Sequence, residues 1–205
     1  MVPFAVQLVS ALPEFAVRYP NIELELTASD RVIDLIAENA DVAIRTGPIR
    51  DTSLVARKLA EVHRHIYASP EYLKRNGTPI APHEFDDHRC ITITPIAGAH
   101  RWLLREKKQV KVYDIDQRIA VDNSEAALRM ALAGGGIVRL GDIVAGDAVR
   151  DGRLVQLFGD IHVVEPVPIS AVYPLGRQSM PKVRAFIEFL IEKFRHAPWR
   201  SIKTA

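Results

Sequence analysis

The chain has 205 residues, of which 48% are apolar and 25% are charged, as is usual for a folded globular protein. Its formal net charge of +2 is too small to indicate nucleic-acid binding, and its single cysteine, Cys90, excludes an intrachain disulfide. The first residues lack the basic and apolar regions of a signal peptide, and no apolar run is long enough to span a bilayer. We therefore expect a cytoplasmic protein of one large or two small domains that does not contact the membrane.

The first quarter of the chain predicts a helix followed by a strand–helix–strand unit. Residues 4–19 read as a helix, and residues 22–28 alternate apolar and acidic side chains, as in a half-buried strand. Ser29 or Asp30 can cap a short helix, and residues 41–45 supply the next strand. Two strands joined by a helix should be parallel, with a right-handed crossover.

The rest of the chain continues to alternate strands and helices. Strands are expected near residues 63–68, 90–94, 102–105, 110–113, 118–121, 136–140 and 169–173. Helices are expected at residues 70–76, 122–134, 142–149 and from Pro181 onward, where apolar residues recur at i, i+3 and i+4 spacing. This alternation predicts an α/β protein.

Three patterns that suggest catalysis or cofactor binding fail in their context. The glycines at 134–136 follow a helix and precede a strand, the reverse of a dinucleotide fingerprint, so a helix C-cap explains them better. His63 and His65 share a strand face but have no evident third metal ligand. Cys90 and His88 lack the third, orienting group that a thiol nucleophile needs. We expect no catalytic residue, no metal and no cofactor.

Polar residues recur where predicted strands end and helices begin, and they form a candidate binding site. In open α/β sheets, ligands lie outside the carboxyl ends of the strands, and helix N-termini there offer N–H donors that suit a carboxylate. Arg45 ends an apolar strand and can grip a carboxylate through two hydrogen bonds. Taken singly, each residue also has a capping or turn role. The candidates are Ser29, Asp30, Arg45, Thr46, Gly47, Thr94, Pro95, Asn123 and Ser124.

The order of the short motifs resembles the effector-binding domain of LysR-type transcriptional regulators. The motifs are LPEF at 12–15, RYP at 18–20, SDRVIDL at 29–35 and DVAIRTGP at 41–48, followed by residues 53–59, 68–73, 77–79, 88–90, 122–126, 133–137 and 181–187. The resemblance implies a type 2 periplasmic-binding-protein-like fold, in which two crossover strands join two α/β lobes with a cleft between them. Lobe I would comprise residues 1–66 and 170–205, and lobe II residues 67–169.

The resemblance also implies a function. The domain would sense a small effector in the cleft, and it would form a homodimer or homotetramer. Arg45 and the helix starts favour an organic anion as that effector. In an antiparallel dimer, the first helix and residues 22–28 of one subunit would face residues 124–133 of the other. The winged helix-turn-helix of such regulators is absent from this chain, so DNA would be contacted only through that missing domain.

Apolar residues extend the candidate site. Gly47 and Pro48 would shape the cleft wall, and Phe4, Pro48 and Ile96 could line an apolar part of it. The first strand of lobe I is short or missing, so Pro3 and Phe4 would be what remains of a ligand-binding loop. Two other classes stay open: a solute-binding protein of an uptake system, and an enzyme on the same fold.

Overall fold

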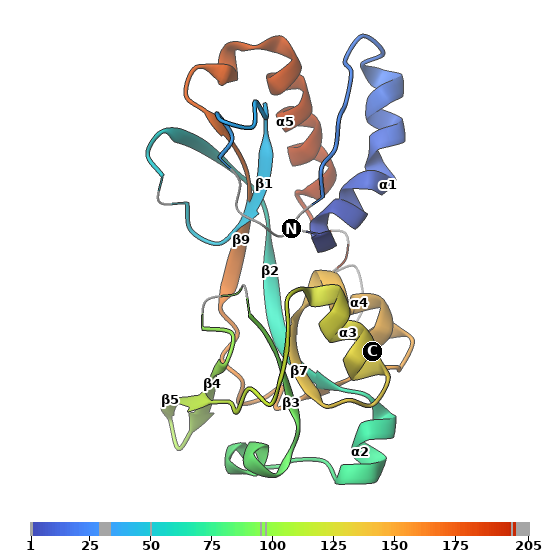
Figure 1. Cartoon of the computed structure of the whole chain (residues 1–205), viewed down its shortest axis with the longest axis vertical. Helices are drawn as coiled ribbons and strands as arrows, with labels where there is room; N and C mark the ends of the chain where they lie inside the picture. Colours follow the sequence, from blue (N-terminus) through green and yellow to red (C-terminus); the bar gives the residue numbers. More distant parts are fainter. Residues whose placement is uncertain are drawn as a thin grey trace. The chain divides into compact units, whose positions relative to one another are not determined.

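The computed structural model describes residues 2–28, 34–49, 51–94, 96, 98–197 and 199. Helices and strands alternate along most of the chain, which confirms the predicted α/β class (Figure 1). The chain forms two compact units, one built from Met1–Val62 with Val167–Ser201 and the other from His63–Pro166. The lobe boundaries expected from the sequence, after residues 66 and 169, lie a few residues further along the chain than these two boundaries. Two strands, β2 (Leu54–Ala68) and β9 (Pro166–Pro174), carry the backbone from one unit to the other.

Two helices of the first unit, α1 (Val2–Arg18) and α5 (Pro181–Phe194), pack side by side through aromatic rings (Figure 1). The ring of Phe15 lies 5.2 Å from that of Phe186 and 5.1 Å from that of Phe189, both in edge-on orientations. Buried aromatic pairs of this geometry stabilise a core beyond the area they remove from water. The predicted first helix is therefore confirmed, with Pro13 inside it.

Residues 22–28 form no strand in the structure, which corrects the prediction of a strand there. The segment has no ladder partner among the described residues, and Leu24 and Leu26 are 42% and 44% exposed. The strand β1 (Ala43–Thr46) pairs antiparallel with β9 instead of parallel with this segment. Alternation of side chains fixes which face a strand would bury, but a strand also needs a neighbour to complete its hydrogen bonds. Most of the helix expected after Ser29 lies outside the described residues.

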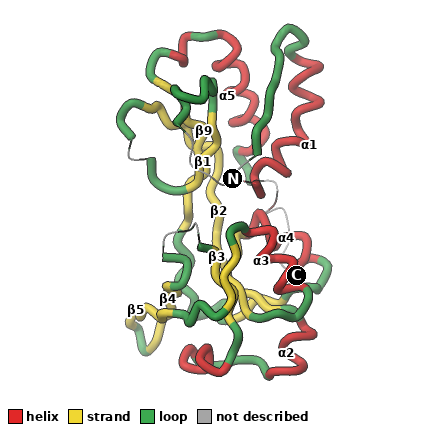
Figure 2. The backbone as a smooth tube through the Cα atoms, in the orientation of Figure 1, coloured by secondary structure: helices red, strands yellow, loops and turns green. Residues whose placement is uncertain are grey.

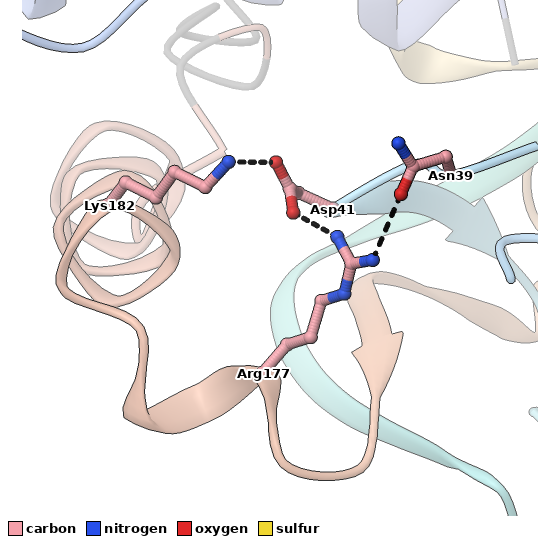
Figure 3. A network of polar contacts seen from close by, with 4 residues as sticks. All are labelled: Asn39, Asp41, Arg177 and Lys182. Carbon is pink, nitrogen blue, oxygen red and sulfur yellow. Dashed lines mark hydrogen bonds and ion pairs between the residues drawn. The ribbon is translucent and has the colours of Figure 1, made fainter.

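An ion network holds the segment that leads into β1 (Figure 3). The Asp41 carboxylate accepts hydrogen bonds from Lys182 Nζ at 2.7 Å and from Arg177 Nη1, and Arg177 Nη2 donates to Asn39 Oδ1 at 3.3 Å. The hydrogen bond from Lys182, aided by the charge of Arg177, lowers the pKa of the Asp41 carboxyl below its usual value. The network therefore ties the start of β1 to the N-terminal end of α5.

The second unit contains a mixed sheet with helices. Parallel pairing joins β3 (Cys90–Ile93) to β6 (Ile119–Val121) and to β7 (Ile137–Gly141), while β2 pairs antiparallel with β7 and β8 (Val155–Leu157). One core joins this sheet to α3 (Ser124–Leu132) and α4 (Asp142–Arg150). A second core contains Trp102 and includes residues of α2 (Pro70–Asn76), of the 3-10 helix η1 (Pro82–Asp87) and of the hairpin β4 (Arg101–Glu106)–β5 (Gln109–Asp114). The backbone of α2 and of the hairpin can be followed in Figure 2.

The glycines at 134–136 end α3, as predicted. Gly134 has a φ of +74°, and the Gly135 N–H donates to the Met130 carbonyl at 2.9 Å, which closes the helix end. Gly136 then brings its backbone against Arg89 as β7 begins. Within the described part of the chain, no helix is both long and apolar enough to cross a membrane.

Candidate ligand-binding site

The end of β1 carries three candidate residues of the first unit. Arg45 and Thr46 are half-buried in the last positions of the strand, and the Gly47 N–H donates to the Pro168 carbonyl at 2.9 Å. Gly47 has a φ of +93°, a left-handed conformation that glycine adopts without steric penalty. The chain therefore turns away directly after the two polar residues, and Pro48 is left exposed.

The Arg45 guanidinium already has an acidic neighbour. The pKa of the Asp51 carboxyl is lowered mainly by a hydrogen bond from the Ser53 hydroxyl at 2.6 Å, and the charge of Arg45 contributes to the same shift. A ligand carboxylate at Arg45 therefore has to compete with Asp51, which is exposed to solvent. The sequence suggested the arginine but gave no sign of this competitor.

In the second unit, parallel pairing brings Thr94 beside the start of α3. Ile93 lies opposite Val121 in the β3–β6 ladder, so the residues that follow each strand lie at the same edge of the sheet. The N–H and hydroxyl of Thr94 donate to the Val121 carbonyl at 2.9 and 3.3 Å. Ile96 is half-buried and packs against the core below α3 and α4. Thr94 and Ile96 are therefore neighbours of the α3 N-terminus in space.

Asn123 is the N-cap of α3, so its side chain is already engaged. Its Oδ1 accepts the Ala126 N–H at 2.8 Å, and its Nδ2 donates to Asp122 Oδ1 at 2.7 Å. The first N–H groups of any helix have no partner within the helix. A ligand at this end of α3 would therefore meet the N–H groups of Ser124 and Glu125 and not the Asn123 amide.

The remaining predicted site residues divide into two groups. Ser29, Asp30 and Pro95 lie outside the described residues. Pro3 and Phe4 lie in the first turn of α1 and not in a loop. Phe4 is 1% exposed, and its ring packs 4.6 Å from that of Phe194 and 6.3 Å from that of Trp199. The apolar side chain of Phe4 thus contributes to the packing of α1 against α5.

A group of basic residues in the second unit was missed by the sequence analysis. Arg64 and Arg139 are half-buried in β2 and β7, and His162 is buried close to them. Burial, together with the neighbouring Arg64, lowers the pKa of Arg139 to about 10. The sequence does show Arg139 within the apolar strand expected at residues 136–140. It does not show which residues lie opposite this arginine in the sheet, so the group could not be recognised.

The structure also bears on the other reactive side chains. Cys90 is buried, and this burial raises the pKa of its thiol to about 12, so the thiol is protonated at neutral pH and is a poor nucleophile. His88 Nδ1 is hydrogen bonded to the Tyr72 hydroxyl at 3.0 Å. Among the described residues, no three His, Cys, Asp or Glu side chains gather into a group that could hold a metal ion.

These features define an α/β domain of two units, with candidate ligand-binding groups at strand ends of each. The chain matches the family model described as LysR substrate binding domain over residues 3–195, and it belongs to that family. The resemblance found in the sequence is therefore confirmed, as is the type 2 periplasmic-binding-protein-like fold.

Several relatives are transcriptional regulators. An HTH-type transcriptional regulator of Xanthomonas campestris pv. campestris is 35% identical over 187 residues, which are 89% of this chain and 54% of that protein. The HTH-type transcriptional regulator CrgA of Neisseria meningitidis serogroup B is 31% identical over 192 residues, 93% of this chain and 64% of that protein. The chain thus spans between about half and two thirds of the length of these two relatives.

Solved structures agree with this family. The regulatory domain of CrgA, a LysR-type transcriptional regulator from Neisseria meningitidis, has a TM-score of 0.87 at 30% identity and covers 94% of this chain and 95% of that domain. The full-length virulence activator AphB of Vibrio cholerae has a TM-score of 0.77 at 29% identity, covering 91% of this chain and 63% of AphB. The match to CrgA therefore extends over nearly the whole of both domains.

Proposed function

We propose that this chain is the effector-binding and oligomerising domain of a LysR-type transcriptional regulator, and that its effector is a small organic anion. The observation that carries the proposal is the β3–β6 register, which brings Thr94 to the start of α3. Arg45 and Thr46 occupy the corresponding strand-end position in the first unit. A guanidinium, hydroxyls and helix N–H groups are all donors, so they suit a ligand that presents carboxylate oxygens.

The effector would act by changing the population of conformations. A ligand shifts such an equilibrium only if it binds one conformation more tightly than the other. In the whole regulator, that change would reach DNA through the DNA-binding domain, and the protein would act in the cytoplasm by binding its effector without converting it. The HTH-type names of the relatives support this role over uptake of a solute.

The outer face of α1 supports the oligomerising role. Leu8 and Phe15 are buried, but Val6, Val9 and Val17 are 62%, 51% and 84% exposed. Exposed apolar side chains that gather on one element indicate a surface that another protein covers. We propose that a second copy covers α1 in a homodimer, or within a homotetramer. Replacing Val6 and Val9 with lysine should lower the mass measured by sedimentation, and an unchanged mass would contradict this interface.

The effector site can be tested by thermal unfolding of the parent, Arg45→Ala and Arg105→Ala against a panel of small organic acids. A ligand that binds only the native state raises the melting temperature by mass action. Arg105 is exposed on β4 and serves as a control for loss of a positive charge. We expect an acid that stabilises the parent and Arg105→Ala but not Arg45→Ala. Equal stabilisation of all three proteins would show that Arg45 does not hold the ligand.

A further inference from the structure

Two arginines lie on one face of the sheet in the second unit. In the antiparallel β2–β7 ladder, Ile66 lies opposite Arg139 and Arg64 lies opposite Gly141. Alternate residues of a strand share a face, and so do residues directly opposite each other. Arg64 and Arg139 are therefore diagonal neighbours on the face that carries Ile66. Diagonal pairs lie roughly 7–8 Å apart at their backbones, which is within reach for long side chains.

Neither guanidinium is paired with a carboxylate among the described residues. Arg64 makes no side-chain hydrogen bond there, and burial alone lowers its pKa. Arg139 Nη1 donates to the backbone carbonyl of Arg101 at 3.1 Å. Among the described residues, the charge of the exposed Glu165 acts on Arg139, and this effect is weaker than the opposing effects of burial and of Arg64. Two positive charges thus stand close together and half-buried, and neither forms an ion pair with a described residue.

Several exposed arginines of the chain, in contrast, do have a carboxylate partner. Five exposed arginines have a carboxylate within 3.2 Å, in the pairs Arg18–Glu192, Arg118–Asp116, Arg129–Glu125, Arg150–Asp147 and Arg153–Asp151. Water already solvates those side chains, so their ion pairs contribute little to stability. Partly buried charges need a counter-charge far more. The missing counter-charge beside Arg64 and Arg139 therefore indicates an anion that is not part of the chain.

His162 is buried close to Arg139. His162 is 8% exposed, its ring lies 6.4 Å from that of His65, and neither of its ring nitrogens has a hydrogen-bond partner among the described residues. Burial, the charge of Arg139 and the neighbouring His65 lower the pKa of His162 to about 4. Among the described residues, neither arginine forms an ion pair with a carboxylate, and the acid whose charge acts on Arg139, Glu165, is exposed to solvent.

We propose that Arg64 and Arg139 form a binding site for a phosphate dianion, either inorganic phosphate or the phosphate group of a small metabolite. Guanidinium groups bind phosphate oxygens through two parallel hydrogen bonds, and two of them match the double charge of one compact group. The site lies entirely within the second unit and does not depend on the effector site proposed for Arg45. It gives this domain a second ligand, which stabilises the β2–β7 pair.

The site can be tested by calorimetric titration of the whole chain with inorganic phosphate, glycerol phosphate and succinate at constant ionic strength. The variants are Arg64→Met, Arg139→Met and, as a control, Arg118→Met on the surface. Phosphate should bind the parent and the control alike, and either substitution in the pair should weaken it by about tenfold or more. Tight binding of glycerol phosphate would identify a metabolite as the source, and binding of inorganic phosphate alone would identify the free ion. Equal affinity for succinate, unchanged affinity in both variants, or no phosphate binding to the parent would each overturn the proposal.

Two further measurements separate the site from a folding defect and from the effector site. Methionine keeps much of the arginine volume without its charge, so both variants should melt at or above the parent temperature without phosphate. Bound phosphate should also raise the pKa of His162, followed by imidazole NMR, because it neutralises Arg139 nearby. A His162 titration that phosphate leaves unchanged would show that the ion binds elsewhere. Arg45→Ala should still bind phosphate, so the two proposals can fail independently.

Discussion

Replacing Gly136 with alanine is expected to destabilise the fold by about 2–3 kcal/mol. A Cβ atom at this position would lie 2.3 Å from the Arg89 carbonyl oxygen and 3.0 Å from its carbonyl carbon. These are backbone atoms, so β7 and β3 must move apart, and the 2.8 Å hydrogen bond from the Ile137 N–H to the same oxygen weakens. Overpacking costs about 1–3 kcal/mol and a hydrogen bond about 1 kcal/mol, against about 0.4–1 kcal/mol gained from a stiffer unfolded chain.

Urea unfolding followed by circular dichroism would measure this loss, with Gly159→Ala as the matched control. A Cβ atom at Gly159 would meet only the end of the Gln156 side chain, at 3.2 Å, and this flexible group can move away. We therefore expect the control to stay within about 0.5 kcal/mol of the parent. If Gly136→Ala were as stable as Gly159→Ala, the close approach of β7 to Arg89 would not constrain this position.

Two further predictions concern the hairpin and the Asp41 network. Lys107 and Lys108 form the β4–β5 turn with φ of 45° and 71°, a conformation that asparagine and glycine adopt more easily than lysine. Replacing them together, Lys107→Asn with Lys108→Gly, should therefore stabilise the fold by about 1–2 kcal/mol in thermal unfolding. A loss of stability would contradict this account of the turn. The pKa of Asp41 is lowered in the folded state, first by the hydrogen bond from Lys182 and then by Arg177. The stability that Asp41 adds to the fold is therefore fully present above the unfolded pKa and is lost as pH falls through the folded pKa. In urea titrations from neutral pH to below about pH 4, the parent should therefore lose more stability than Asp41→Asn, and parallel curves would count against the network.

Local signals predicted the helix ends and the turns of this protein well. Ser69 accepts the Tyr72 N–H at the start of α2, and Gly77 closes that helix, as their positions in the sequence indicated. Gly134 likewise follows the end of α3, as its position indicated, whereas the N-cap of that helix is Asn123. These features depend on groups within a few residues of one another, so neighbouring residues suffice to define them.

Pairing between distant segments decided what local patterns could not. Residues 22–28 have the alternation of a strand but no partner beside them, and β1 pairs with β9, far along the chain. Phe4 was expected to meet a ligand, yet it packs against Phe194 in the last helix. In each case the pattern identifies an apolar side chain without identifying what will cover it.

The sequence by itself determined the α/β class, the family and most helix ends of this domain, because these depend on local spacing and on the order of motifs. Only the tertiary structure brought Thr94 to the N-terminus of α3 and Arg64 to the side of Arg139. A binding site requires groups that converge in space, and strand register sets that convergence. Register follows from hydrogen bonds between segments far apart in the chain, so the sequence pattern of either segment alone does not contain it.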